Sequence, residues 1–97
     1  MELMGRFEII VLNDTAYMNI NNKLHVVQSV IFDNKMYTID DAKFLLKAND
    51  LKCKKIDITK NYIRFRQEDP KDLHKMGLYN VKTIQTLLDG VKLIVYY

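Results

Sequence analysis

Alternating apolar and polar positions predict strands in the first third of the chain. Residues 6–12 (RFEIIVL) alternate in this way and predict a first strand. Residues 24–32 (LHVVQSVIF) are rich in β-branched residues and apolar on both faces near their end, so we expect a second strand in the centre of a sheet. Residues 13–23 are rich in asparagine, which favours turns, and predict a loop into which a short strand over residues 17–20 would fit.

The pattern changes to helical spacing after residue 38. Thr38 and Asp41 match a capping box, in which each side chain accepts a hydrogen bond from the backbone N–H of the other residue. The residues that follow have the spacing of one helix face, which is formed by Ile39, Ala42, Leu45, Leu46 and Asn49. Acidic residues in the first turn and Lys47 near the end suit the helix dipole. We therefore expect a helix over residues 39–49, with Lys43 and Lys47 pointing outward.

Residues 54–67 (KKIDITKNYIRFRQ) predict a β-hairpin. The turn is expected at Lys60-Asn61, because asparagine tolerates the positive φ that tight turns need. A two-residue turn there places one set of side chains on the inner face: Ile56, Ile58, Ile63 and Phe65. It places a second set on the outer face: Asp57, Tyr62, Arg64 and Arg66. A slip of one residue would turn the apolar set outward, so the pattern determines the register, which sets Asp57 opposite Arg64.

The last third of the chain predicts a loop and a second hairpin. The proline in residues 68–70 ends the preceding strand, and residues 71–80 are expected to form a loop or a single helical turn. Further on, Asp89-Gly90 is a strong type I′ hairpin signal. Pairing across that turn would join Leu88 with Val91, Thr86 with Leu93, and Ile84 with Val95. A helix over residues 81–88 is the alternative, but the β-branched residues of this segment favour a strand.

The order of these elements, β-β-α-β-β-β-β, predicts an α+β fold. We expect one domain, residues 1–97, in which an antiparallel sheet of about five to six strands is packed by one main helix at about residues 39–49. A chain of 97 residues is too short for two cores. Hydrophobic residues make up 48% and charged residues 28%, which is ordinary for a globular protein and excludes a disordered chain.

Charge, cysteine content and the N-terminal segment narrow the functional classes. The net charge of +3 is mild and favours polyanionic partners only slightly. The apolar run near the N-terminus is interrupted by Arg6 and Glu8, so it predicts neither a signal peptide nor a membrane span. A single cysteine excludes an internal disulfide and fits a reducing compartment.

The stretch KNYIRFRQEDP carries the clearest candidate binding residues. Arginine contacts phosphate and tyrosine offers a stacking surface, which is a pattern of nucleic-acid binding. Arginine and tyrosine are also enriched at protein–protein hot spots. The simplest alternative is a solvated sheet face on which Arg64 pairs with Asp57 across the strands. The candidate partner-binding residues are Tyr62, Arg64, Arg66, Lys54, Lys55 and Lys60.

Catalysis is not indicated by any spacing in the chain. His25 and His74 have no convergent carboxylate or nucleophile, so we expect both to be structural or exposed. The lysines around Cys53 favour a thiolate, but no second cysteine or nearby histidine accompanies it. The carboxylate pairs at residues 40–41 and 68–69 are explained by helix capping and strand termination. We therefore expect no enzyme, no cofactor and no metal site.

Three segments resemble a family of small uncharacterised proteins from large DNA viruses and tailed phages: QSVIFDNKMYTIDDAKFLLKANDLK (28–52), TKNYIRFRQEDP (59–70) and LLDGVKLIVYY (87–97). In that family an S-V-I-F-D strand leads into a helix with an A-x-x-W-L core. An R-F-R or R-Y-R strand follows, and then a terminal strand that ends in aromatic residues. The chain departs from the pattern at residues 44–46 (FLL), where a tryptophan is usual. The family has no assigned activity, so the resemblance implies a viral or phage origin and no mechanism.

Two functional hypotheses follow. The first is a small, non-enzymatic viral or phage-type protein-interaction module, a virion component or an inhibitor of a host factor or host defence, located in the host cytoplasm or the virion. It would use the basic sheet face or an edge strand, and an edge strand would also allow self-association. A terminal strand that ends in Tyr96 and Tyr97 either packs in the core or presents such an edge. The alternative hypothesis is a nucleic-acid-binding accessory protein that uses the same Lys/Arg/Tyr face.

Overall fold

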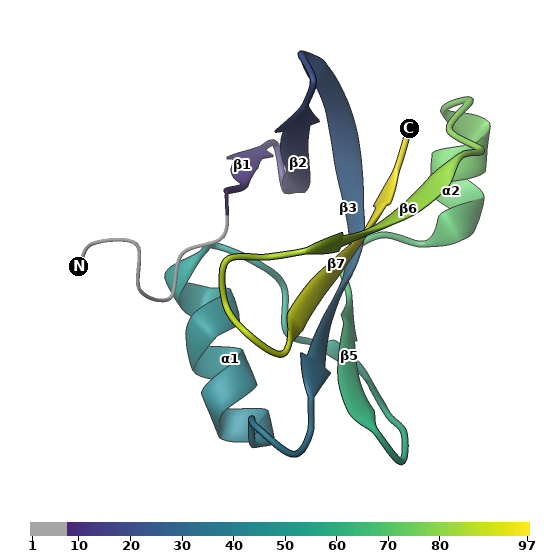
Figure 1. The fold of residues 1–97 in the computed structure, drawn as a ribbon. Helices are drawn as coiled ribbons and strands as arrows, with labels where there is room; N and C mark the ends of the chain where they lie inside the picture. Colours follow the sequence, from purple (N-terminus) through teal and green to yellow (C-terminus); the bar gives the residue numbers. More distant parts are fainter. Residues whose placement is uncertain (1–7) are drawn as a thin grey trace.

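Residues 8–97, which the computed structural model describes, form seven strands and two helices (Figure 1). In chain order these elements are β1 (Ile10–Leu12), β2 (Thr15–Ile20), β3 (Lys23–Asp33), α1 (Ile39–Ala48), β4 (Lys55–Ile58), β5 (Tyr62–Arg66), α2 (Pro70–Lys75), β6 (Val81–Gln85) and β7 (Val91–Tyr96). All strand pairs are antiparallel. The predicted α+β fold is confirmed, with somewhat more strands than expected. The part of the first predicted strand before residue 8 lies outside the described residues.

Strand β3 organises the sheet, as its apolar sequence predicts. One edge of β3 pairs with β7 over residues 26–32, and the opposite edge is shared by two strands. Its first residues pair with β2 and its last residues, from Ser29 on, pair with β5. An eleven-residue strand spans roughly 36 Å, which is long enough for two short strands to share one edge.

A β-bulge at Gln28 decides which side chains of β3 reach the core. The register with β7 shifts between Val27 and Ser29, so Gln28 is the extra residue. Val27 and Val30 both lie in the main core, although they are three positions apart and a regular strand would place them on opposite faces. Because of the bulge, Gln28 and Ser29 are fully buried polar residues near the middle of the sheet.

The main core lies between the sheet and α1. Ala42 and Leu46 of the helix are fully buried against side chains of β3, β5 and β7. The capping box is confirmed: Thr38 Oγ1 accepts from Asp41 N and Asp41 Oδ2 accepts from Thr38 N, each at 3.1 Å. The helix ends at Ala48, one residue before the predicted end.

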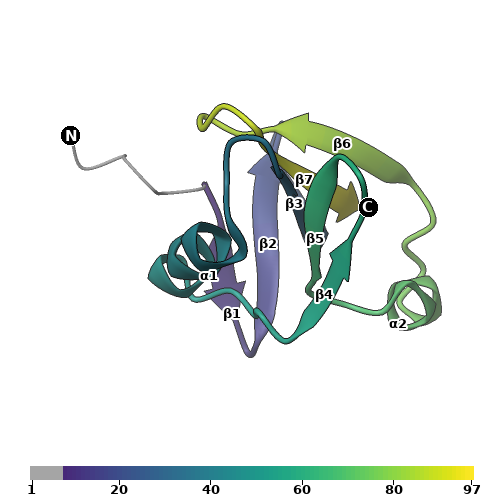
Figure 2. The same cartoon turned by 90° about the horizontal axis from the view of Figure 1, so that it is seen from below.

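The second helix, α2, lies at the other end of the sheet from α1 (Figures 1 and 2). It starts at Pro70 with Asp69 as N-cap, within a segment where a loop or a single turn was expected. Leu73 packs in a second, smaller cluster with Val26 and Tyr96. Since β7 has a neighbour on both edges and Tyr96 is buried, the structure decides between the two alternatives for the terminal strand in favour of core packing.

The turns lie close to the predicted positions, but their backbone conformations differ from the predicted ones. The type I′ signature of two successive positive φ angles occurs at Asn13-Asp14 and Asn21-Asn22, on either side of β2, within the segment expected as a loop. The β6–β7 register is shifted by two residues from the predicted one: Ile84 pairs with Leu93, not Val95. A shift of two residues leaves the same side chains on the inner face. The predicted strand is confirmed for residues 81–85. The predicted type I′ turn at residues 89–90 is not formed.

Candidate functional site

The β4–β5 hairpin places the predicted binding residues on one face. The observed register is the predicted one, with Asp57 opposite Arg64 and Ile56 opposite Phe65. Ile63 and Phe65 are buried, whereas the alternate residues of β5 are half-buried on the opposite side. We call this side of β4, β5, β3, β7 and β6 the outer face. Ile58, predicted to lie on the inner face, pairs with the buried Ile63 but is itself 63% exposed on the edge strand β4, so it does not join the core.

The hairpin turn lies at Lys60-Asn61, but its geometry is not the predicted one. Neither residue has a positive φ. Instead, Asn34 holds the turn from the end of β3: its side-chain amide donates to the carbonyls of Thr59 (3.2 Å) and Lys60 (2.9 Å). The turn is therefore fixed by a long-range contact to another strand, which the local sequence does not reveal.

Strands far apart in the sequence complete the outer face around β5. Across β3, Asp33 pairs with Tyr62, Ile31 with Arg64 and Ser29 with Arg66. Lys92 of β7 lies opposite Ile31, and Gln85 of β6 lies opposite Lys92. One row across the sheet thus runs through Asp57, Arg64, Ile31, Lys92 and Gln85. One cation, Arg64, therefore lies on one side of Ile31, and a second cation, Lys92, lies on the other.

Arg64 is held by the buried polar residues at the bulge. Its Nη2 donates to Gln28 Oε1 at 2.8 Å and its Nε donates to Ser29 Oγ at 3.1 Å. Ser29 Oγ donates to the same Gln28 Oε1 at 2.6 Å, and Gln28 Nε2 donates to the carbonyl of Glu68 at 3.0 Å. Two of the guanidinium nitrogens are thus used internally, while Nη1 makes no hydrogen bond to any residue in the range 8–97. The expected ion pair between Arg64 and Asp57 is absent.

Asp57 pairs instead with Arg66, diagonally across the hairpin. Arg66 Nη2 lies 3.5 Å from Asp57 Oδ2, and both side chains are substantially exposed, at 37% and 54%. A solvent-exposed pair of this kind contributes at most about 1 kcal/mol. The Nε of Arg66 is buried and has no hydrogen-bond partner. A buried donor without an acceptor lowers the stability of the fold, and Arg66 Nε differs in this respect from the hydrogen-bonded nitrogens of Arg64.

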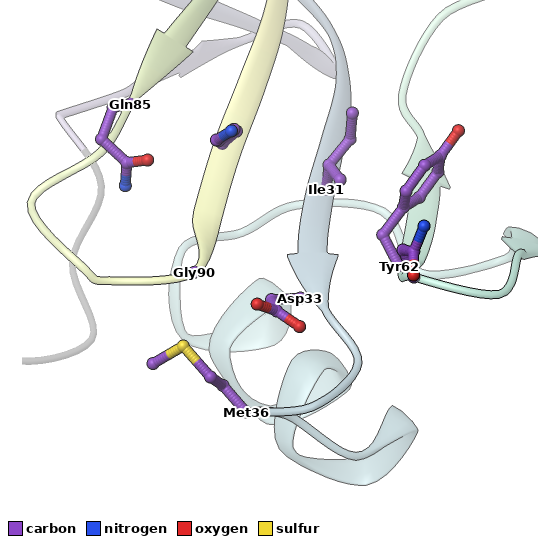
Figure 3. Close-up of a pocket in the computed structure, with 8 residues that line it drawn as sticks. Ile31, Asp33, Met36, Tyr62, Gln85 and Gly90 are labelled. Atoms are coloured by element: carbon purple, nitrogen blue, oxygen red, sulfur yellow. The ribbon is translucent and has the colours of Figure 1, made fainter.

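A groove of about 380 Å³ opens on the outer face beside Tyr62 (Figure 3). Its lining residues are Ile31, Asp33, Met36, Asn61, Tyr62, Gln85, Gly90 and Lys92. Figure 3 shows Tyr62 on one side of it and Gln85 on the other, with Ile31 on the strand between and Met36 below. The groove therefore combines aromatic, apolar and amide-bearing side chains with one basic side chain, Lys92, and one carboxylate, Asp33.

The six predicted binding residues do not form one site. Tyr62 lines the groove, and Arg64 lies in the next position along the same face. Lys54, Lys55 and Arg66 line a second cavity, of about 160 Å³, near the start of α2. Lys60 is exposed at the tip of the hairpin and lines neither cavity. Their binding role stays a prediction.

The groove residues that the sequence prediction missed come from β3, β6 and β7. Lys92 and Gln85 carry a weak signal, because both are polar residues that alternate with apolar ones in their strands. Gln28 and Ser29 carry none, because a bulge is needed to bring them under Arg64.

The residues with catalytic or metal-binding potential lie apart from the groove. His25 is buried, with Nδ1 3.0 Å from the carbonyl of Lys23 and its ring 4.5 Å from that of Tyr97. The ring of His74 is exposed on α2, stacked on Tyr79 at 5.4 Å, and Cys53 packs against the main core. Among residues 8–97, no cluster of three His, Cys, Asp or Glu side chains is arranged to hold a metal ion.

Two titratable groups have shifted pKa values: Asp69, which lines the second cavity, and Tyr37, which directly precedes the N-cap of α1. The backbone N–H of Lys71 holds the pKa of the Asp69 carboxyl below its usual range, and the charges of Lys71, Arg66 and Lys55 add to this. Burial raises the pKa of Tyr37, and the carboxylates of Asp89 and Asp41 raise it further.

Two further findings bear on identity. No helix in the described part of the chain has the length and apolar character needed to cross a membrane. Compared with models of protein families, with curated proteins and with solved structures, the chain has no match, so the viral or phage resemblance stays a prediction.

Proposed function

We propose that the protein is a small, non-enzymatic protein-interaction module that binds an acidic segment of a partner protein in the groove of the outer face. The partner is viral or host, in keeping with the expected origin in a virus or phage and a role as virion component or as inhibitor of a host factor. The observation that carries the proposal is the groove itself, with Tyr62 and Lys92 in its lining and Arg64 next to it.

Pre-organisation of Arg64 supports this proposal. Its guanidinium is already oriented by Gln28 and Ser29, so less side-chain entropy is lost when a ligand binds. The remaining Nη1 amino group is available to a carboxylate, and Lys92 supplies a second cation across Ile31. Tyr62 and Ile31 offer the aromatic and apolar contact that protein hot spots use.

The alternative function, nucleic-acid binding on the same face, is favoured by the cations and by the half-exposed ring of Tyr62. Carboxylates interrupt that surface, however. Asp57 lies 3.5 Å from Arg66, Asp33 lines the groove opposite Tyr62 in the strand register, and Glu68 lies 3.3 Å from Lys52. A phosphate backbone would meet these charges at close spacing, which favours a segment with discrete acidic side chains over a uniform polyanion.

Selection of binding peptides from a random displayed library tests the proposed function. We expect enrichment of acidic peptides, whose affinity falls about tenfold or more in Lys92→Ala and Tyr62→Ala. Both substitutions leave the Arg64 network intact. Lys47→Ala on α1 removes the same charge as Lys92→Ala but lies outside the groove, so it should bind as the wild type does.

Two outcomes would reject the proposal. The first is that selected peptides bind Lys92→Ala and Tyr62→Ala as well as the wild type. The second is binding to single-stranded DNA or RNA that weakens steeply with rising salt and competes with any selected peptide, which would favour the alternative.

A further inference from the structure

One side of α1 is exposed along the length of the helix. Its exposed residues are Asp40, Asp41, Phe44, Lys47 and Ala48. At 3.6 residues per turn these positions span roughly 120° around the helix axis, and Phe44 lies at their centre. Figure 2 shows α1 at the periphery of the molecule, and its opposite side packs in the main core. We call the exposed side the free face of α1.

Phe44 gives the free face an apolar centre. It is 73% exposed, more than any other large hydrophobic residue in the part of the chain that the structure describes. Burial of an aromatic side chain is a main source of binding energy at protein interfaces. Beside the ring lies a hollow of about 300 Å³, lined by Met36, Tyr37, Asp41, Phe44 and Leu45. The free face therefore combines a projecting ring with a largely apolar hollow next to it.

The two ends of the free face carry opposite charges. Asp40 lies about one turn before Phe44 and Lys47 about one turn after it. Both lie on the same side of the ring, at roughly 40° and 60° around the helix axis. Neither Asp40 nor Lys47 forms an ion pair within 4.0 Å with any residue in the range 8–97. Both charges are therefore available to a partner.

A two-fold axis that passes by Phe44, perpendicular to α1, matches these charges. It sets two helices antiparallel, so that the N-terminal end of one free face lies against the C-terminal end of the other. Because Asp40 and Lys47 lie on the same side of Phe44, Asp40 of one copy then faces Lys47 of the other, and the same pair forms a second time. On the other side of the ring Ala48 lies opposite Asp41, where its small side chain lets the helices approach closely. The free face is thus complementary to itself.

We propose that the protein forms a two-fold symmetric dimer through the free face of α1, with the two Phe44 rings at its centre. A second copy is the occupant that the charges specify, because it carries the same order of acid, ring and base and meets it in reverse. The inference goes beyond the proposed function and is independent of it, because Asp40, Phe44 and Lys47 do not line the groove.

The dimer is expected to be weak. One helix face per copy buries less surface than the roughly 1,600 Å² of a standard protein–protein interface. The ion pairs lie at the rim of the contact, where water and salt screen them. We therefore expect a dissociation constant on the order of 100 µM, so that the monomer predominates in dilute solution.

Sedimentation equilibrium of the full chain, at concentrations from about 10 to about 500 µM, tests the inference. We expect a monomer–dimer equilibrium that is weakened about tenfold or more by Phe44→Ser. Because Phe44 is exposed, this substitution should leave the melting midpoint unchanged. Tyr79→Ser is the matched control: it removes a ring of similar exposure, 68%, from the segment after α2, and should leave the equilibrium unchanged.

Exchange of the charges tests the antiparallel arrangement. Asp40→Lys sets two lysines against each other across the dimer, and Lys47→Glu sets two carboxylates against each other. Each variant alone should associate at least about fivefold more weakly than the wild type. In an equimolar mixture, each dimer of one Asp40→Lys chain and one Lys47→Glu chain regains both pairs of opposite charge and should form about as tightly as the wild-type dimer. A fold defect in either variant cannot produce this recovery.

Three results would overturn the inference. They are a monomer at every concentration, equal association of Phe44→Ser and Tyr79→Ser, and a mixture of the two charge variants that associates no more tightly than each alone. Peptides selected for binding to the groove should bind Phe44→Ser as they bind the wild type. Failure of the dimer and failure of the proposed function can therefore be distinguished.

Discussion

Gln28 is the residue on which the outer face depends most. Its side chain is fully buried, and its one amide joins β3 to Glu68, Ser29 and Arg64. Removal of the amide would take the partner from the Glu68 carbonyl and from two donors, Ser29 Oγ and Arg64 Nη2. We expect Gln28→Ala to lower the free energy of unfolding by about 2–3 kcal/mol, measured by urea denaturation.

A double-mutant cycle separates this network from simple loss of volume. In an Arg64→Met background, one of the donors that Gln28 satisfies is already gone. Gln28→Ala should then cost about 1 kcal/mol less than in the wild type. Additive effects of the two substitutions would show that the hydrogen bond does not couple them.

The shifted pKa of Tyr37 predicts a pH dependence of stability. Its hydroxyl donates to the carbonyl of Asp89 at 2.7 Å, and burial, followed by the charges of Asp89 and Asp41, raises its pKa above the ordinary 10.0. Above pH 10 the unfolded chain therefore releases a proton that the folded protein still holds, so stability falls as pH rises through this window. Urea midpoints measured from pH 8 upward should fall less steeply in Tyr37→Phe than in the wild type. Parallel curves would exclude the linkage.

At the scale of elements, the two hairpins differ in how far local sequence decides their register. The β4–β5 register could be predicted because Ile56, Ile63 and Phe65 have only one arrangement that points them inward. In the β6–β7 loop, the Asp89-Gly90 signal is overridden by Thr86. Its hydroxyl donates to the carbonyl of Val91 and accepts from Leu88 N, which closes a wider loop.

The candidate site divides in the same way. The alternation of β5 is sufficient to place Tyr62, Arg64 and Arg66 on one face. The separation of that face into a groove and a second cavity could not be predicted, because the groove depends on β3, β6 and β7, and the second cavity depends on residues 52–54 and 67–69, which flank the hairpin. Long-range strand pairing brings these elements together, and nothing within one segment specifies it.

Gly90 and Gly77 form a matched pair for a prediction on turns. Both have positive φ, +78° and +82°. A Cβ at Gly77 would meet nothing within 4 Å, whereas one at Gly90 would lie 2.7 Å from Met36 Sδ and 3.1 Å from Tyr37 Cε2. We expect Gly77→Ala to cost about 1–2 kcal/mol from backbone strain alone, and Gly90→Ala to cost more, by thermal or urea unfolding. Equal costs would mean that Met36 moves away freely.

The capping box allows a test of α1 by itself. Thr38→Ala removes the acceptor for Asp41 N and should lower the free energy of unfolding by about 1 kcal/mol. Thr38→Ser keeps the hydroxyl and should lie close to the wild type. An unchanged melting midpoint in Thr38→Ala would count against a contribution of this cap to the fold.

At the scale of the whole molecule, protection is expected to be graded from the centre of the sheet outward. Amides of β3 and β7 lie between strands on both edges and over the main core, whereas β1, β4 and β6 have a neighbour on one edge. Within residues 8–97 these three strands are the ones that could add a strand from a partner or a second copy. The charged side chains of Lys55 and Asp57 on β4, and of Lys82 on β6, oppose such pairing.

Hydrogen exchange at two protein concentrations tests both the gradient and the predicted self-association. In a dilute sample, amides of β4 and β6 should exchange at least about tenfold faster than those of residues 93–95 in β7. If an edge strand pairs with a second copy, its amides should gain protection at high concentration while those of β1 or of the remaining edge do not. Protection of all edges that is independent of concentration would contradict self-association through a strand. Binding through the groove of the outer face would then remain as the proposed mode of interaction with a partner protein.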